Sequence, residues 1–229
     1  MFQPVITIDG PVGAGKTTVG RLVAGELGFA FLDTGVLYRA LAMLLLRVGA
    51  DKDDYAQAEV IARNMNVKML LEDEHHMLEI NGEVVSEELY SPDIEQIVSH
   101  VAQQPRVRSS LLPIQRDIAS TGPIVLVGRD VGSIVCPDAE LKIYIDAPVA
   151  VRAERKYLEK IDSGDTISKS IILSLLQNRD EVDSDRDVSP LVVPERAIVI
   201  QSENLSAMQV ATLIISYFSD LRGREEQLT

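Results

Sequence analysis

The chain has 229 residues, 46% of them hydrophobic, and carries 22 Lys and Arg against 35 Asp and Glu, a formal net charge of −13. This length suits one α/β domain with an insertion, or two small domains, and the composition excludes a disordered tail or a fibre. A surface this acidic repels a phosphate backbone, so we expect no nucleic-acid partner.

The acidity is uneven along the chain. Residues 51–100, the acidic segment, contain thirteen acidic and three basic residues, and the rest of the chain is nearly balanced. The negative charge therefore belongs mostly to one part of the molecule and leaves room for a cationic site elsewhere.

The sequence gives no indication of export or of a membrane. The longest apolar run, residues 41–46, is too short to span a bilayer, and the N-terminus lacks the pattern of a secretory signal. The single cysteine, Cys136, cannot form an intramolecular disulfide. We expect a cytoplasmic protein with no membrane partner.

Short apolar runs predict the strands of a central sheet. In chain order they cover residues 4–8, 29–32, 124–127, 141–145 and 197–200. Helical spacing follows the first run, and residues 38–48 predict a largely buried helix. Apolar runs without alternation are typical of a parallel sheet covered on both faces, so we expect a doubly wound α/β fold.

Two segments depart from this pattern. Between residues 51 and 105, the runs 67–71, 77–80 and 83–85, with Asn81-Gly82 before the last, predict an antiparallel meander, and we interpret the whole range as a mostly antiparallel insertion. Residues 151–158 and 168–178 predict two helices joined by the polar residues 160–166.

Residues 10–17 match the phosphate-loop (P-loop) pattern G-x-x-x-x-G-K-[ST] between a predicted strand and a predicted helix, the context that the motif requires. The glycines let consecutive N–H groups point at phosphate oxygens, Lys16 supplies a mobile positive charge, and the Thr17 hydroxyl can ligate Mg²⁺. The predicted nucleotide-binding residues are Gly10, Pro11, Val12, Gly13, Ala14, Gly15, Lys16, Thr17 and Thr18.

Other P-loop families fit less well. The guanine-reading motif Asn-Lys-x-Asp is absent, because no Asn in the sequence is followed by Lys. Asp146 ends an apolar strand, as the Mg²⁺-binding acid of motor-type ATPases does, but a helix cap or a turn favours the same residue, and we do not count it as a site residue.

Arginines recur near the ends of the predicted strands and in the following loops. They are Arg39, Arg106, Arg108, Arg129, Arg152, Arg155, Arg179 and Arg186. Ligands of open α/β sheets bind beyond the carboxyl ends of the strands, where these cations can converge. Such a cluster suits a kinase whose acceptor is itself a phosphate, since guanidinium groups bind phosphate bidentately.

The ordered set of motifs resembles the bacterial-type cytidylate kinases, a family of nucleoside monophosphate kinases, over essentially the whole length. The motifs are Ile8-Asp9-Gly10-Pro11, Leu32-Asp33-Thr34-Gly35 with Tyr38-Arg39, Pro105-Arg106-Val107-Arg108, Gly128-Arg129-Asp130-Val131-Gly132, Pro137-Asp138-Ala139, Arg179-Asp180 leading to Asp183 and Arg186, and Ser189-Pro190-Leu191.

The resemblance implies a single P-loop kinase domain, residues 1–229, that transfers the γ-phosphoryl group of ATP, with Mg²⁺, to CMP or dCMP. Its core would comprise residues 1–62, 101–150 and 187–229, its monophosphate-binding insertion residues 63–100, and its helical lid residues 151–186. A monomer is expected.

The resemblance also implies roles for individual residues. The acceptor phosphate would be bound by Arg39, Arg129 and Arg186, with Thr34 beside them. Cytosine would be read by Ser99, Arg108 and Asp130, and the ribose would be contacted by Arg179 and Asp183. The ATP phosphates would be contacted by Arg152 and Arg155 when the lid closes. Lys16, Arg129 and Arg186 would be the catalytic residues. A carboxylate accepting from the cytosine amino group fits this assignment chemically.

Some positions depart from the family pattern. Val12 and Thr34 stand where many members have Ser, and Val182 and Ser184 stand where some have arginine. These departures leave the expected reaction unchanged. Two alternatives stay open at this stage: a small-molecule kinase acting on a different monophosphate or on a hydroxy acid, and a regulatory nucleotide-binding protein without turnover.

Overall fold

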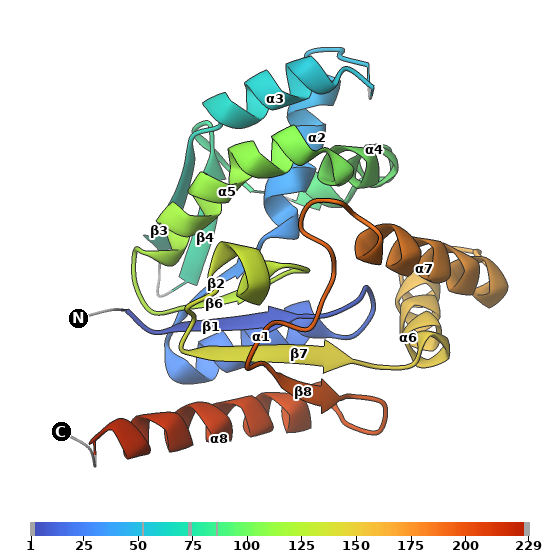
Figure 1. Cartoon of the computed structure of the whole chain (residues 1–229). Coiled ribbons are helices and arrows are strands. Elements are labelled where there is room, and N and C mark those ends of the chain that lie inside the picture. Colours follow the sequence, from blue (N-terminus) through green and yellow to red (C-terminus); the bar gives the residue numbers. More distant parts are fainter. Residues whose placement is uncertain (1–2, 52, 73–74, 86, 227–229) are drawn as a thin grey trace. The chain divides into compact units, whose positions relative to one another are not determined.

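The computed structural model describes residues 3–51, 53–72, 75–85 and 87–226 (Figure 1). The chain folds into two compact units. Unit 1 contains Met1–Phe31 and Pro123–Thr229, and unit 2 contains Leu32–Gly122.

The central sheet has five strands in the order β2-β6-β1-β7-β8. They are β1 (Val5–Asp9), β2 (Ala30–Asp33), β6 (Ile124–Val127), β7 (Leu141–Asp146) and β8 (Ile198–Gln201). β1 pairs in parallel with β6 and with β7, and β7 pairs in parallel with β8. The predicted parallel sheet is confirmed, and each strand lies within one residue of its expected start and end.

The helices of unit 1 follow the strands. They are α1 (Lys16–Leu27), the π-helix η2 (Val131–Val135), α6 (Val149–Asp162), α7 (Lys169–Ser184) and α8 (Ala207–Glu226). Apolar side chains of α1 and α8 pack with the sheet strands in one core around Ile6, Ile8 and Ile143, which are fully buried. This core holds the carboxyl end of β1, where the P-loop begins, in a fixed position.

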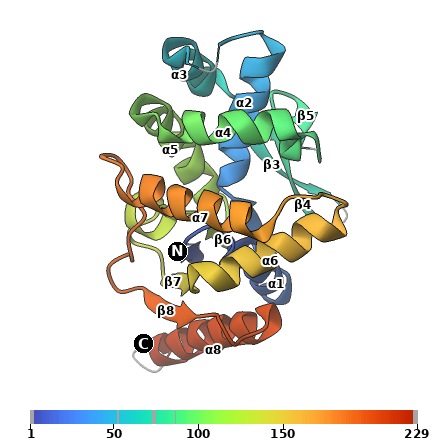
Figure 2. The same cartoon turned by 90° about the vertical axis from the view of Figure 1, so that its right-hand side faces the viewer.

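Helices α6 and α7 form a pair that lies side by side along much of its length (Figure 2). Both predicted helices are confirmed and are longer than the apolar spacing indicated. The small core between them contains Ala153, Ile172 and Leu176, and the P-loop residue Val12 packs against it. The P-loop is therefore in direct contact with this helix pair.

Unit 2 combines helices with a small sheet. Its elements are α2 (Gly35–Arg47), α3 (Tyr55–Asn64), β3 (Val67–Glu72), β4 (His75–Ile80), β5 (Glu83–Val84), the 3-10 helix η1 (Glu87–Tyr90), α4 (Pro92–Gln103) and α5 (Pro105–Ala119). β3, β4 and β5 form the predicted antiparallel meander. Asn81 and Gly82 turn between β4 and β5 with positive φ, the conformation that favours Asn-Gly in hairpins.

The interpretation of residues 51–105 as mostly antiparallel is wrong, because α3, η1 and α4 also lie in this range. In α4, Ile94, Val98 and Val101 are buried at helical spacing, and Ser91 and Pro92 stand at positions typical of a helix start. Unit 2 is also wider than residues 63–100, since α2 packs with α4 and α3 with α5. The functional boundaries of insertion, core and lid stay predictions.

None of the helices in the described ranges is long and apolar enough to cross a bilayer.

Candidate active site

The P-loop joins β1 to α1 and depends on three glycines with positive φ: Gly10 (146°), Gly13 (79°) and Gly15 (94°). A Cβ at Gly10 would lie 2.1 Å from the carbonyl oxygen of Ile145, and one at Gly13 would lie 3.1 Å from Cβ of Arg152. Only glycine combines this backbone conformation with such close neighbours. The chain is thereby curled at the N-terminus of α1, an arrangement that binds anions.

Lys16 lies at the start of α1 and is 7% exposed. Its Nζ donates to the carbonyl oxygen of Pro11 at 2.7 Å, which holds the ammonium group against the loop. Thr17 and Thr18 follow on the same helix, Thr17 partly buried and Thr18 exposed.

Asp9 connects β1 to η2. Its carboxylate is fully buried and accepts from the backbone N–H groups of Val131 and Gly132, each at 2.7 Å. Burial raises the pKa of this carboxyl to about 6, and neighbouring Asp130 adds to the rise, whereas the two hydrogen bonds and Lys16 oppose it. Asp9 thus fixes the segment that carries Arg129 and Asp130.

Three arginines share one buried carboxylate, that of Asp183 near the end of α7, which is 1% exposed. Arg129 Nε donates to it at 2.8 Å, Arg179 Nε lies 3.3 Å from it, and Arg186 Nη2 also pairs with it. Arg129 further reaches the carbonyl oxygen of Gly10 at 3.4 Å. The cluster carries three positive charges against one negative charge and lies beside the P-loop, so it suits a phosphate ligand.

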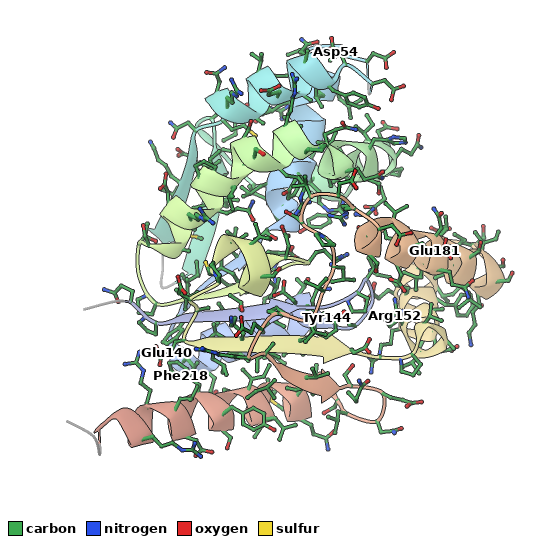
Figure 3. The ribbon with its side chains drawn as sticks, viewed as in Figure 1. Asp54, Glu140, Tyr144, Arg152, Glu181 and Phe218 are labelled. Carbon is green, nitrogen blue, oxygen red and sulfur yellow. The ribbon has the colours of Figure 1, made fainter. Side chains whose placement is uncertain are left out.

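Arg152 on α6 is almost completely buried against the P-loop, and Figure 3 shows it at the start of this helix beyond the end of β7. Its guanidinium group pairs with both carboxylate oxygens of Asp180, at 3.1 and 2.6 Å. It also donates to the carbonyl oxygens of Val12, at 3.1 Å, and Ala147, at 2.8 Å.

Arg155, one turn further along α6, lies against the turn after β8. It donates to the hydroxyl of Ser202 at 3.1 Å and to the carbonyl oxygen of the same residue at 2.5 Å. Its Nη1 also reaches the carbonyl oxygen of Ala14 at 3.5 Å. All of these acceptors are oxygen atoms of the protein. The expected contact of Arg152 and Arg155 with the phosphates of ATP stays a prediction.

The remaining expected acceptor residues lie in unit 2. Arg39 pairs with Glu95 at 2.6 Å and lies 4.9 Å over the ring of Tyr90. Arg108 is buried, donates to the carbonyl oxygen of Ala102 at 2.9 Å and lies 5.3 Å over the ring of Tyr38. Thr34 is buried at the N-terminus of α2, and Ser99 is on α4.

The structure thus groups the expected site residues by unit. Unit 1 holds the P-loop with Arg129, Asp130, Arg152, Arg155, Arg179, Asp183 and Arg186, and unit 2 holds Thr34, Arg39, Ser99 and Arg108. Asp9, Asp180 and Ser202 were not among the site residues predicted from the sequence. Asp9 directly follows the predicted strand 4–8, and Ser202 stands two residues after the predicted strand 197–200, so a position just beyond a strand's carboxyl end was the available signal.

The glycine-curled loop joins a strand to a helix that begins with a buried lysine, and an arginine cluster lies beside the loop. These features define the class: a P-loop phosphotransferase of the α/β type. A family model described as cytidylate kinase matches residues 6–220. The chain belongs to the cytidylate kinase family.

Individual relatives agree with this assignment. The chain is 42% identical over 221 residues to a cytidylate kinase of Roseiflexus castenholzii, covering 94% of each chain. It is 38% identical over 224 residues to one of Pelotomaculum thermopropionicum, covering 97% of this chain and 98% of the relative.

Solved structures share the fold at low sequence identity. A gluconokinase from Sinorhizobium meliloti 1021 matches with a TM-score of 0.50 and 14% identity, covering 100% of this chain and 98% of its own. An uncharacterized protein from Eubacterium ventriosum matches with a TM-score of 0.53 and 13% identity, covering 95% and 99%. These likenesses concern the fold alone.

The raised pKa of Asp9 predicts a pH dependence of stability. The folded value of about 6 exceeds the ordinary value of 3.8, so the folded state binds more protons between them. The contribution of Asp9 to the free energy of unfolding therefore falls as pH rises from about 4 to about 6, by about 3 kcal/mol.

Asp9→Asn lacks this titration. The free energy of unfolding of the wild type minus that of the variant, measured with urea, should decrease between about pH 4 and about pH 7. A difference that stays constant over this range would contradict the raised pKa.

Proposed function

We propose that this chain transfers the γ-phosphoryl group of MgATP to CMP or dCMP, giving ADP and CDP or dCDP. The observation that carries the proposal is the Asp183 carboxylate with Arg129, Arg179 and Arg186 around it, in the same compact unit as the P-loop. A donor loop for one polyphosphate and a separate arginine cluster for a second phosphate are what this reaction requires.

The P-loop residues, Gly10 to Thr18, bind the phosphates of ATP in this proposal. The N–H groups of the curled loop and the N-terminus of α1 favour phosphate oxygens, and Lys16 supplies the charge that faces the β- and γ-phosphates. Lys16 is already held at the loop through the carbonyl oxygen of Pro11, so little side-chain freedom is lost on binding.

The donor set near the loop fits Mg²⁺. Within the described ranges no group of three or more His, Cys, Asp or Glu side chains could hold a metal ion alone. Mg²⁺ at kinase sites takes few protein ligands and completes its shell with phosphate oxygens and water, and the Thr17 hydroxyl suits this role. Bound there, the ion would neutralise charge on the transferring phosphoryl group.

Arg129 and Arg186 bind the phosphate of the acceptor, and Arg39 and Thr34 of unit 2 complete its expected ligands. Arg179 and Asp183 contact the ribose, whose hydroxyls pair well with a carboxylate. Ser99, Arg108 and Asp130 read cytosine. The burial of Arg108 supports its part, because a base-reading arginine must be held in one orientation to discriminate.

The chemistry needs no general base. With a second phosphate pKa near 6, the phosphate of CMP is mostly a dianion at neutral pH, and one of its oxygens attacks the γ-phosphorus directly. The new O–P bond forms as the bond from the γ-phosphorus to the β–γ bridging oxygen breaks, and the electron pair leaves with ADP. Lys16, Arg129 and Arg186 stabilise the charge on the transferring group.

The proposal also includes the expected lid, monophosphate-binding insertion, oligomeric state and compartment. The α6–α7 pair, within residues 151–186, acts as the lid, residues 63–100 form the monophosphate-binding insertion, and the protein works as a cytoplasmic monomer. Exclusion of water by the lid would suppress hydrolysis of ATP.

A panel of acceptors tests the reaction. ADP release from MgATP is measured with CMP, dCMP, UMP, AMP and GMP in turn. We expect CMP and dCMP to be the best acceptors, UMP to be weaker, and AMP and GMP to be near background. AMP as the best acceptor, or no stimulation by any monophosphate, would contradict the proposal.

Asp183→Asn tests the arginine cluster. The change removes the charge that orients Arg129, Arg179 and Arg186 and weakens the proposed contact of Asp183 with the ribose. Since hydrogen bonds to charged groups contribute about 1.5–3 kcal/mol each, kcat/KM for CMP should fall about a hundredfold or more.

Asp185→Asn is the matched control, because Asp185 lies two residues away and is exposed. It should keep kcat/KM within about twofold of the wild type, as surface substitutions usually do. An equal loss in both variants, or none in Asp183→Asn, would rule out the assigned role.

A further inference from the structure

Carbonyl oxygens along the P-loop accept from cationic side chains. The contacts are Arg129 Nη1 to Gly10 at 3.4 Å, Lys16 Nζ to Pro11 at 2.7 Å, Arg152 Nη1 to Val12 at 3.1 Å and Arg155 Nη1 to Ala14 at 3.5 Å. The four donors come from three separate segments of unit 1, so the loop is held from several directions.

A carbonyl group that is fixed in this way also fixes an N–H group. The peptide unit is planar and trans, so its C=O and the following N–H point in opposite directions. Holding the carbonyls of Val12 and Ala14 on the arginine side therefore directs the N–H groups of Gly13 and Gly15 to the opposite side. Both glycines have positive φ, and since glycine has the widest conformational freedom, such contacts are what fixes the orientation of these peptide units.

Arg152 is itself held in place. Its side chain is 6% exposed, it forms a two-point pair with Asp180, and it donates to the carbonyl oxygen of Ala147. These contacts use four of the five N–H groups of the guanidinium group. Moving the group toward a phosphate would break charge-assisted hydrogen bonds in a buried setting, which is costly. The close approach of Gly13 to Arg152 leaves no space for a side chain between them.

Ser202 connects Arg155 to the loop. Its hydroxyl accepts from Arg155 Nη1 at 3.1 Å and donates to the carbonyl oxygen of Ala14 at 3.4 Å. Ser202 is 3% exposed, and its own N–H donates to the carbonyl oxygen of Asp146 at the end of β7. A buried relay therefore runs from α6 through the turn after β8 to the P-loop.

We propose that Arg152 and Arg155 are positioning residues that orient the N–H groups of the P-loop, with Ser202 as an essential part of the Arg155 relay, and that neither arginine contacts the ATP phosphates. The inference deepens the proposed function, and it rests on that function only in requiring that the loop bind a nucleotide. It gives Ser202 a role in nucleotide binding that acts through the P-loop backbone alone.

Backbone NMR and calorimetry test the relay in the full chain. Arg155→Met should lower the order parameter of the Gly15 amide in the nucleotide-free protein from the rigid range, about 0.85, to below about 0.6. It should weaken binding of ADP and of ATP by the same factor, about tenfold, the loss typical of one charge-assisted hydrogen bond.

Ser202→Ala should change the Gly15 amide in the same direction and weaken ADP binding about threefold, as removal of one hydroxyl hydrogen bond does. The double variant should bind ADP no more weakly than Arg155→Met, because the two side chains act in one relay. Arg155→Lys, which keeps the charge but not the two-point geometry, gives the same readout if the Met variant does not fold.

Lys156→Met and Ser219→Ala are the matched controls. Lys156 is the next residue on α6 and pairs only with Glu159 among the described residues, and Ser219 is an exposed serine whose hydroxyl donates within α8. Both should leave the Gly15 amide and the ADP affinity unchanged.

Two results would overturn the inference: an unchanged Gly15 amide in Arg155→Met, or a loss of ATP affinity much larger than the loss of ADP affinity, which indicates contact with the γ-phosphate. These measurements do not use CMP. A wild-type protein that fails to phosphorylate CMP but shows the expected ADP results would therefore refute the proposed function and leave this inference standing.

Discussion

The structure depends on one constraint: a short stretch of backbone must turn its N–H groups toward an anion while its carbonyl groups accept from cationic side chains. Glycines at positions 10, 13 and 15 supply the backbone conformation. Lys16, Arg129, Arg152 and Arg155 supply the donors. Much of unit 1 around the loop can be understood as the framework that places those four cations.

That framework explains the buried carboxylates of unit 1. Asp9 anchors the segment after β6, Asp180 orients Arg152, and Asp183 gathers three arginines. Asp180 and Asp183 offset the cost of burying the arginines and at the same time fix where their charges lie. Asp9 instead holds backbone N–H groups. The excess of guanidinium groups over carboxylates leaves the cluster positive, which suits a ligand that brings its own negative charges.

The net charge of −13 does not describe this region. The acidic segment, residues 51–100, lies in unit 2, whereas the P-loop and the Asp183 cluster lie in unit 1. An acidic surface repels long polyanions, and a compact cationic site can still bind small ones through short-range contacts. The distribution of charge is therefore compatible with nucleotides as substrates.

The sequence predicted the sheet and the P-loop well, because apolar runs and a glycine pattern with a lysine are local signals. Val12 was recognised as a departure from the family's serine, but only the structure reveals its packing against the cluster of Ala153, Ile172 and Leu176. The helix α4 was missed because its stripe of Ile94, Val98 and Val101 lies next to a strong hairpin signal.

The site was predicted residue by residue only where a motif or the family resemblance reached. Ser202 stands 188 residues from Ala14, whose carbonyl group it contacts. Asp180 stands 168 residues from Val12, whose carbonyl group is held by the partner of Asp180, Arg152. No local pattern encodes such separations. The contacts of Arg152 and Arg155 with the P-loop carbonyl groups were likewise not predictable, because the family resemblance implied only a role toward the ATP phosphates.

The most direct test of this account is a crystal structure of the chain with MgADP bound. The account predicts that Arg152 remains hydrogen-bonded to the carbonyl oxygen of Val12, and Arg155 and Ser202 to that of Ala14, while the N–H groups of Gly13 and Gly15 face phosphate oxygens. A structure in which either arginine leaves its carbonyl group and binds a phosphate oxygen would contradict it.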